Sequence, residues 1–336
     1  MSPAAVRREL EAALIAILVA LAAGSLLMIV AGVSPLDGWR TMAVRTFGNA
    51  YGLGQVIYRM TPLVLTGLAV AVPLRAGLFN IGGEGQMVAA ALVCAVVAAA
   101  IPAGTPAVIA VPLGLAAAAA AGAGVGAATG ALRAYRGAHE VIAAIMLNAI
   151  IAGVALWLGN TWLFTGESTS SAAVVAGARL PSLGITGSGA SASLAVAVVA
   201  AAGCAWLFGR TVTGFRWRMV GAGPDAARAS GLDVARAQVS AMAVAGAMAG
   251  LAGAHFVLAD EHAYQDGLGR GQGFLGVAVA LLAGGRPAAL VASAFVFGAL
   301  AQGGLEVLEL VPKEIVDVLQ AIVVMVAAVT LGRRPR

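Results

Sequence analysis

Long apolar stretches separated by short polar ones dominate this sequence. Most of them approach or exceed the roughly 20 residues that a helix needs to cross the hydrocarbon core of a bilayer. Of the 336 residues, 61% are hydrophobic and only 10% are charged, which excludes an ordinary water-soluble fold. We therefore expect an all-α polytopic membrane protein, a single transmembrane domain over residues 1–336. The pattern predicts about ten helices, at 11–32, 56–75, 85–102, 106–132, 140–159, 190–209, 238–258, 272–284, 287–305 and 314–331.

The distribution of positive charge predicts an orientation. The formal net charge of +5 is compatible with nucleic-acid binding, but the arginines lie in short loops between apolar runs, where membrane topology explains them better. With both termini in the cytoplasm, fourteen of the 20 Lys and Arg residues lie inside and six outside, as the positive-inside rule requires. Segment 210–237 is then cytoplasmic. Segment 160–192 is the longest outer loop, either a flexible connector or a docking surface for an external partner.

Residues 77–86, GLFNIGGEGQ, place four glycines and three polar side chains, Asn80, Glu84 and Gln86, between two apolar stretches. A carboxylate at bilayer depth costs about 2.5–3.5 kcal/mol on insertion scales, so it usually marks a transport pathway. Glycines at that depth allow a helix to break and to expose its backbone to a cavity rather than to lipid. The motif therefore indicates transport.

Two of the predicted helices are unusual. In 56–75, Arg59 must extend outward to the interface, which leaves an apolar core of only 61–74. The 272–284 segment is too short to cross as a straight helix. The first runs into GLFNIGGEGQ and the second follows DGLGRGQGF. The helices that follow Glu84 and Gln272 are expected to run in opposite directions, which suggests an inverted repeat of about five helices with a binding site near the midplane.

The cytoplasmic loop 210–237 contains a compact helix signature. Pro224 suits the first helical position, Asp225 complements the positive end of the helix dipole, and Gly231 can end the helix in a left-handed conformation. A helix of about two turns is marginal alone, so packing must support it. The loop is either a plain basic segment held by lipid headgroups or a short helix presented to a soluble partner.

Three separated motifs resemble one known family. They are AGLFNIGGEGQM at 76–87, GAHEVIAAIMLN at 137–148 and GFRWRMVGAGPDAARASGL at 214–232. They resemble the permease subunits of ATP-binding-cassette (ABC) importers, in the branch that handles nucleosides and simple sugars. The similarity continues through GFLGVAVALLAG at 273–284. Two departures are His139, where the family usually has Asn, and Gly223, where Asn commonly precedes the proline.

The resemblance implies a function and a set of partners. It implies a permease of the bacterial plasma (inner) membrane that works with cytoplasmic ATPase subunits, a second permease (identical or paralogous) and an extracytoplasmic binding protein. Nucleosides are the expected substrates, with a simple sugar such as ribose as the alternative. Residues 221–231 would form the coupling helix that docks into the ATPase. The implied coupling residues are Arg216, Arg218, Gly221, Pro224, Asp225, Arg228 and Gly231.

The chain lacks the residues for chemistry of its own. A P-loop needs a lysine after a glycine-rich loop, and the single lysine is Lys313, in ELVPKEI. We therefore expect no cofactor in this chain, with ATP and Mg²⁺ bound by the partner ATPase, and no enzymatic activity. His139, His255 and His262 are isolated, so no metal site is expected. Cys94 and Cys204 lie inside apolar runs and are expected to be small buried side chains.

Seven residues are candidates for the substrate pathway, and each has more than one interpretation. Glu84 contacts substrate, carries a proton, or caps a helix N-terminus. The amides either bind substrate or satisfy backbone groups freed by the glycines, and an intrahelical amide seeks a partner across a helix interface. The aromatic side chains either stack on a base or pack in the core. The candidates are Phe79, Asn80, Glu84, Gln86, Asn148, Gln272 and Phe274.

Two other classes of function compete with an ATP-driven importer. An ion-coupled secondary transporter would use Glu84 and Asp317 as ion or proton sites. A membrane enzyme would need a catalytic constellation that the sequence does not contain. A helix shaped to meet a soluble ATPase has no use in a secondary transporter, so the cytoplasmic loop favours the importer.

Overall fold

A computed structural model describes residues 18–308 except 20, 167 and 186, together with residues 318, 321, 322 and 325. Within this part of the chain the regular structure is helical apart from three isolated β-bridges. Seven helices are long and apolar enough to cross a membrane, or eight if Leu21–Val30 and Pro35–Phe47, bent by 118°, form one span. The predicted all-α membrane fold is confirmed, and the count of ten is roughly matched. The last predicted helix, 314–331, lies almost wholly outside the described residues.

The observed boundaries agree with most of the predicted ones. The predicted 272–284 segment is short, as expected, at 11 residues. The helices are α2 (Pro35–Phe47), α3 (Ala50–Leu74), α4 (Gly83–Ala100), α5 (Ala107–Arg136), α6 (Glu140–Leu158), α7 (Ser193–Arg210), α8 (Val212–Ala222), α9 (Pro224–Ala229), α10 (Val234–His255), α11 (Gln272–Leu282) and α12 (Pro287–Glu306). Single turns of π-helix, Gly159–Leu163 and Phe256–Asp260, extend α6 and α10.

Helix α3 differs from its prediction. It begins six residues early because the Asn49 side chain caps it, accepting a hydrogen bond of 2.7 Å from the Gly52 N–H. It then continues through Arg59 for 25 residues, so the helix is longer than the predicted 56–75. The Arg59 side chain has a polar partner within the protein. Its Nε donates to Oε1 of Gln302 on α12 at 3.0 Å. This polar partner allows a charged residue within the span.

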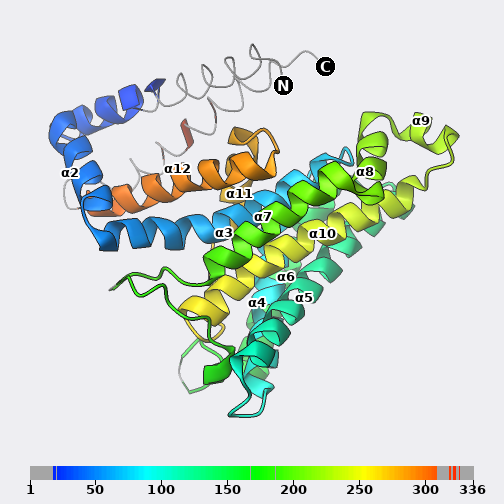
Figure 1. Cartoon of the computed structure of the whole chain (residues 1–336), viewed down its shortest axis with the longest axis horizontal. Helices are drawn as coiled ribbons and strands as arrows, with labels where there is room; N and C mark the ends of the chain where they lie inside the picture. Colours follow the sequence, from blue (N-terminus) through cyan, green and yellow to red (C-terminus); the bar gives the residue numbers. More distant parts are fainter. Residues whose placement is uncertain are drawn as a thin grey trace.

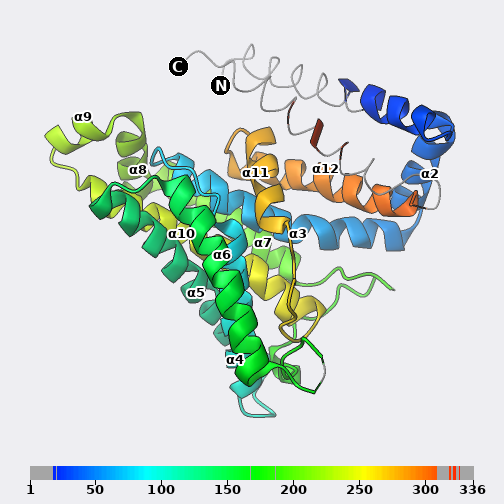
Figure 2. The ribbon, with the colours of Figure 1, turned by 180° about the vertical axis from the view of Figure 1, so that it is seen from behind.

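Helices α3 and α10 form the centre of the molecule and are the most buried of the long helices. Helix α3 packs against α10, α11 and α12, whereas α5 lies along α10 (Figures 1 and 2). Glycines bring these last two backbones into contact. A Cβ atom on Gly122 would lie 2.2 Å from the carbonyl oxygen of Gly246, and one on Gly246 would lie 2.0 Å from that of Gly122. Small residues are the usual means of close helix packing in membranes.

Helix α6 is the most exposed of the long helices. Apolar side chains such as Ile142, Met146 and Ile150 are more than half exposed along it. Near its C-terminal end Trp157 and Trp162 contact one another edge to face, with ring centroids 5.1 Å apart. Aromatic pairs of this kind are typical of the membrane–water interface. This side of the molecule therefore has the character of a lipid-facing surface.

The two loops singled out in the sequence lie at opposite ends of the molecule (Figure 1). Helices α8 and α9 extend beyond one end, and most of the 160–192 loop lies at the other. This loop is not a free connector where the structure describes it. The N–H groups of Ser171, Val174 and Leu180 donate to the carbonyl oxygens of Tyr264, His262 and Leu258, respectively, at 2.7–2.9 Å. The loop is therefore fixed to the chain that follows α10.

Candidate substrate pathway and coupling site

A pair of buried amides supports the break between α3 and α4. Asn80 and Gln86 are both 0% exposed, and each donates to the other, at 2.9 and 3.2 Å. Asn80 also donates to the carbonyl oxygen of Ala69 (3.1 Å) and accepts from the Gly82 N–H (2.9 Å). Both donors and both acceptor positions of Asn80 are thus used. In this conformation the amides satisfy backbone groups freed by the break, which was one of the two predicted interpretations.

Asn148 joins α6 to the same segment. Its Oδ1 accepts from the Gly85 N–H (2.9 Å), and its Nδ2 donates to the carbonyl oxygen of Ile81 (3.1 Å). The expected partner across a helix interface is confirmed. Gly85 makes the approach possible, since a Cβ atom there would lie 2.9 Å from the Asn148 Cα.

Glu84 connects the two glycine-broken segments. Its Oε1 accepts from the Gly271 N–H at 2.7 Å and its Oε2 accepts from the Gly273 N–H at 2.9 Å. The carboxylate therefore caps the N-terminus of α11, where a negative charge is favourable. Gly273 permits the contact, because a Cβ atom there would lie 2.3 Å from the Glu84 nitrogen. Of the three interpretations of Glu84, helix capping is the one that the geometry matches, but the capped helix is α11 rather than the expected one, which begins beside Glu84.

The two broken segments thus meet at their N-termini. Helices α4 and α11 begin side by side and lead away from one another, one toward each end of the molecule (Figures 1 and 2). This is the opposition of directions expected from the sequence. The inverted repeat of about five helices stays a prediction.

The three remaining candidates differ in how exposed they are. Phe274 on α11 is 51% exposed. Phe79 is half-buried and packs against the core. The Oε1 atom of Gln272 is shielded from solvent and has no hydrogen-bond partner among the described residues. Of the seven candidates, four polar side chains therefore hold the broken helices together. Phe79, Gln272 and Phe274 lie in the two glycine-broken segments without such a role.

Segment 210–237, called the coupling loop here after its implied role, contains two helices rather than one. Helix α8 was not predicted, and it ends at Ala222, so residues 221 and 222 belong to it rather than to the short helix. Helix α9 starts with Pro224, as expected. Gly231 has a φ of +81° and its N–H donates to the carbonyl oxygen of Arg228. The predicted left-handed end of the helix is therefore confirmed, whereas the single helix over 221–231 is corrected.

Side chains anchor α8 to the transmembrane helices. Trp217 is 1% exposed, and its Nε1 donates to Ser240 Oγ on α10 at 3.0 Å. Arg218, one of the implied coupling residues, donates through Nη1 to the carbonyl oxygen of Phe208 on α7. This contact helps to hold the loop, and the predicted contact of Arg218 with the ATPase stays a prediction. A signal for α8 existed in Thr211, a good N-cap residue whose hydroxyl accepts from the Gly214 N–H.

The other arginines of the loop remain available to a partner. Arg228 pairs with Asp225 at 2.8 Å, but both side chains are largely exposed, and such pairs contribute little to stability. Arg216 is exposed and has no hydrogen-bond or ion-pair partner in the described part of the chain. It lines a cavity of about 370 Å³ between α8 and α10, together with Trp217 and Arg236.

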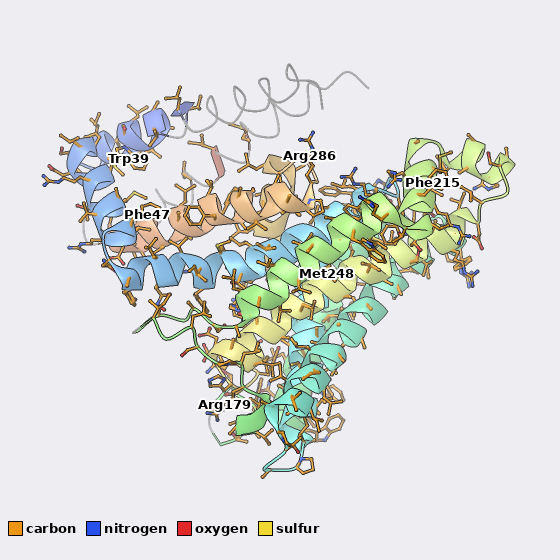
Figure 3. All side chains as sticks on the ribbon, in the orientation of Figure 1. Trp39, Phe47, Arg179, Phe215, Met248 and Arg286 are labelled. Atoms are coloured by element: carbon orange, nitrogen blue, oxygen red, sulfur yellow. The ribbon has the colours of Figure 1, made fainter. Side chains whose placement is uncertain are left out.

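A positive cluster lies beside this loop. Arg75 follows α3, and burial, together with the charges of Arg218 and Arg286, lowers its pKa. Its guanidinium lies 5.0 Å from the centre of the Phe208 ring and donates through Nη2 to the carbonyl oxygen of Gly285 at 3.1 Å. Figure 3 shows Arg286 at the turn between α11 and α12 and Phe215 on α8. No sequence pattern indicated this role of Arg75, because its partners are backbone and ring atoms.

A second network was also missed, where α10 ends. His255 is 1% exposed, and its Nδ1 lies 2.7 Å from Ser193 Oγ, which contacts Ser191 Oγ at 2.6 Å. Tyr58 donates through its hydroxyl to Asp260. No group of metal-ligating side chains occurs within the described residues. Cys94 and Cys204 are free and buried, as predicted.

Comparison with known proteins identifies the family. A family model described as a branched-chain amino acid transport system / permease component matches residues 52–328. The chain belongs to this permease family. Over 321 residues the permease is 37% identical to the guanosine ABC transporter permease NupP of Bacillus subtilis, across 94% of this chain and 92% of that relative.

Other relatives extend the comparison. The permease is 32% identical to a glucose ABC transporter permease of Haloferax volcanii, across 92% of this chain and 84% of the relative. It is 30% identical to the nucleoside ABC transporter permease NupB of Lactococcus lactis, across 96% and 91%. No solved structure matches the permease.

These findings confirm the resemblance seen in the three sequence motifs. The permease is a multi-pass membrane subunit of an ABC transporter. Subunits of this class are not themselves enzymes, and they act with ATPase and binding-protein partners.

Proposed function

We propose that this permease imports nucleosides delivered by an extracytoplasmic binding protein. It lies in the bacterial inner membrane with both termini in the cytoplasm. The observation that carries the proposal is the 37% identity with a guanosine permease along nearly the whole chain. A second relative named for nucleosides and the FNIGGEGQ segment support the same substrate class.

A simple sugar is the second candidate. The glucose permease relative is 32% identical across most of the chain, so overall identity does not separate the two substrates strongly. A nucleoside presents a ribose and a base, whereas a sugar presents hydroxyl groups alone. An aromatic side chain that stacks on a base therefore favours a nucleoside.

For the pathway, we propose that Phe79, Gln272 and Phe274 contact substrate. The exposed ring of Phe274 offers a stacking surface, and the unpaired Oε1 of Gln272 offers an acceptor for an N–H or hydroxyl group. The other candidates shape the path by holding the broken helices. They are Asn80, Glu84, Gln86 and Asn148.

For energy coupling, we propose that α9 docks on a cytoplasmic ATPase that binds ATP and Mg²⁺, and that a second permease completes the path. Helix α9 extends beyond the transmembrane helices (Figure 1), and Arg216 offers its charge to carboxylates on the partner. Pro224, Asp225 and Gly231 shape the helix, and Arg228 lies on it.

The substrate is tested in proteoliposomes that contain the permease with its ATPase, second permease and binding protein. ATP-driven uptake of radiolabelled guanosine is measured with a tenfold excess of unlabelled guanosine, uridine, ribose or glucose. We expect the unlabelled nucleosides to lower uptake of label about tenfold and the sugars to leave it unchanged. ATP-driven uptake of labelled glucose or ribose without uptake of guanosine would reject the nucleoside proposal in favour of the sugar.

A further inference from the structure

The end of α8 touches the turn that leads into the broken helix. A Cβ atom on Gly221 would lie 2.4 Å from the carbonyl oxygen of Arg75 and 2.9 Å from the nitrogen of Gly77. A Cβ atom on Gly77, whose φ is +73°, would lie 3.2 Å from the Gly221 Cα. The two backbones are therefore in direct contact, with no side chain between them to absorb a movement.

On the cytoplasmic side of this contact, α8 is held as a rigid body. Trp217 fixes it to α10, and Arg218 fixes it to α7. Gly214 brings its first turn against the end of α7, since a Cβ atom there would lie 2.1 Å from the carbonyl oxygen of Leu207. Helix α9 follows after the single residue Gly223. A displacement of α9 therefore reaches Gly221 through a short and well-packed path.

On the other side of the contact, the turn is bound to the buried amides. The Leu78 N–H donates to the carbonyl oxygen of Pro73 at 3.0 Å, and Leu78 is 2% exposed. Asn80, which uses both amide atoms to hold the break between α3 and α4, lies only three residues beyond Gly77. Three residues span at most about 10 Å. A shift at Gly77 is thus imposed directly on the amide pair.

Arg75 gives the same turn a second connection. It binds the carbonyl oxygen of Gly285 at 3.1 Å, at the turn after α11. The opposite end of α11 is held by Glu84. Both ends of this short helix are therefore linked to the segment between α3 and α4, and one of those links passes through the turn that Gly221 touches.

We propose that Gly221, Gly77 and Arg75 are positioning residues that carry the movement of α9 to the two broken helices. This proposal rests on the proposed docking of α9 on the ATPase. It gives Gly221 a role inside the permease rather than at the ATPase surface. An added methyl group at Gly221 pushes the backbones apart, so the ATPase still binds but its cycle no longer drives the pathway.

The test compares Gly221→Ala with Gly209→Ala in the reconstituted complex. A Cβ atom on Gly209, near the end of α7, meets nothing within 4 Å, which makes it a matched control. We measure ATPase association, ATP hydrolysis, thermal stability and substrate transported per ATP. We expect Gly221→Ala to keep association and hydrolysis within twofold of wild type and to lower transport per ATP at least tenfold. Gly209→Ala should match wild type in all four.

An unchanged transport per ATP in Gly221→Ala would overturn the proposal. Should Gly221→Ala fail to assemble, hydrogen exchange of the wild-type complex decides. With a non-hydrolysable ATP analogue, we expect amide protection to change together in residues 221–231 and 75–82. A change confined to 221–231 would overturn the proposal. This exchange experiment needs no transported substrate, so its result is independent of whether guanosine is imported.

Discussion

At the scale of single residues, Glu84 is the clearest junction in the molecule. Both of its oxygens accept backbone N–H groups from the start of α11. A carboxylate engaged in this way serves as a structural cap, which argues against the ion-coupled alternative in which Glu84 carries protons. Asp317, the second ion-site candidate of that alternative, lies outside the described residues.

We predict that Glu84→Gln destabilises the permease. The amide has one acceptor oxygen and no charge, so one of the two charge-assisted hydrogen bonds is lost, at a cost of about 1.5–3 kcal/mol. The measurement is the thermal unfolding midpoint of the purified protein in detergent. Glu261→Gln is the control, because Glu261 is exposed. Equal midpoints for the two variants would show that the cap contributes nothing.

The titration of His262, in the chain that follows α10, is expected to make the stability of the permease depend on pH. The residue's φ of +54° is left-handed. Burial, then the charge of Arg179, lowers its pKa, opposed by Asp260 and the carbonyl oxygen of Leu258. Below the ordinary histidine pKa of about 6.5 the unfolded chain takes up the proton more readily than the folded protein. The free energy of unfolding therefore decreases as the pH is lowered, and it levels off below the folded-state pKa.

The variant His262→Asn removes this titration and keeps a residue type that tolerates left-handed backbone. We expect its unfolding midpoint to fall less than that of the wild type between pH 7.5 and 5.0. Identical slopes for the two proteins would contradict the assignment to His262.

The sequence predicted at this scale which polar residues matter, but not what they bind. Asn80 and Gln86 were recognised because glycines surround them in an apolar chain. The partners of Glu84 lie 187 and 189 positions away, and no local pattern reveals such a contact. The contact of His255 with Ser193 was not predicted because the two residues lie 62 positions apart.

At the scale of elements, apolar length predicted nearly every membrane helix. Apolar length alone did not predict the full extent of α3. Arg59 lies within this helix, and its side chain has a polar partner in Gln302 on another helix. Helix α8 was missed because it is neither apolar nor amphipathic enough to show a pattern. Tertiary anchors such as Trp217 hold it in place.

Glycine packing between α5 and α10 gives a test at this scale. We predict that Gly122→Ala destabilises the permease by about 1–3 kcal/mol through overpacking against Gly246. Gly124→Ala, on the exposed side of the same helix, meets nothing within 4 Å and should be neutral or slightly stabilising. Thermal unfolding in detergent compares the two. A smaller loss in Gly122→Ala than in Gly124→Ala would reject the packing argument.

The coupling loop gives a second test at the scale of elements. We predict that Arg216→Glu lowers the affinity of the permease for its ATPase at least tenfold, because an exposed charge aimed at partner carboxylates is reversed. Arg136→Glu, at the end of α5, makes the same charge change outside the loop and should leave affinity within twofold. Co-purification at rising salt measures both. Equal losses would point to net charge rather than to α8.

At the scale of the whole molecule, two long loops lie at opposite ends of the permease, and the two glycine-broken segments lie between them. The coupling loop lies at one end and the ordered 160–192 loop at the other (Figure 1). The segments between them meet at Glu84 and the buried amides. The family relationship agrees with our proposal that a partner ATPase drives this gate.

The source of energy tests this account most directly. Guanosine uptake is measured in proteoliposomes with ATP and no ion gradient, and with proton or sodium gradients and no ATPase. We predict uptake only when ATP, the ATPase and the binding protein are all present, with no effect when gradients are collapsed. Accumulation of guanosine by the permease alone, driven by a gradient, would contradict the account.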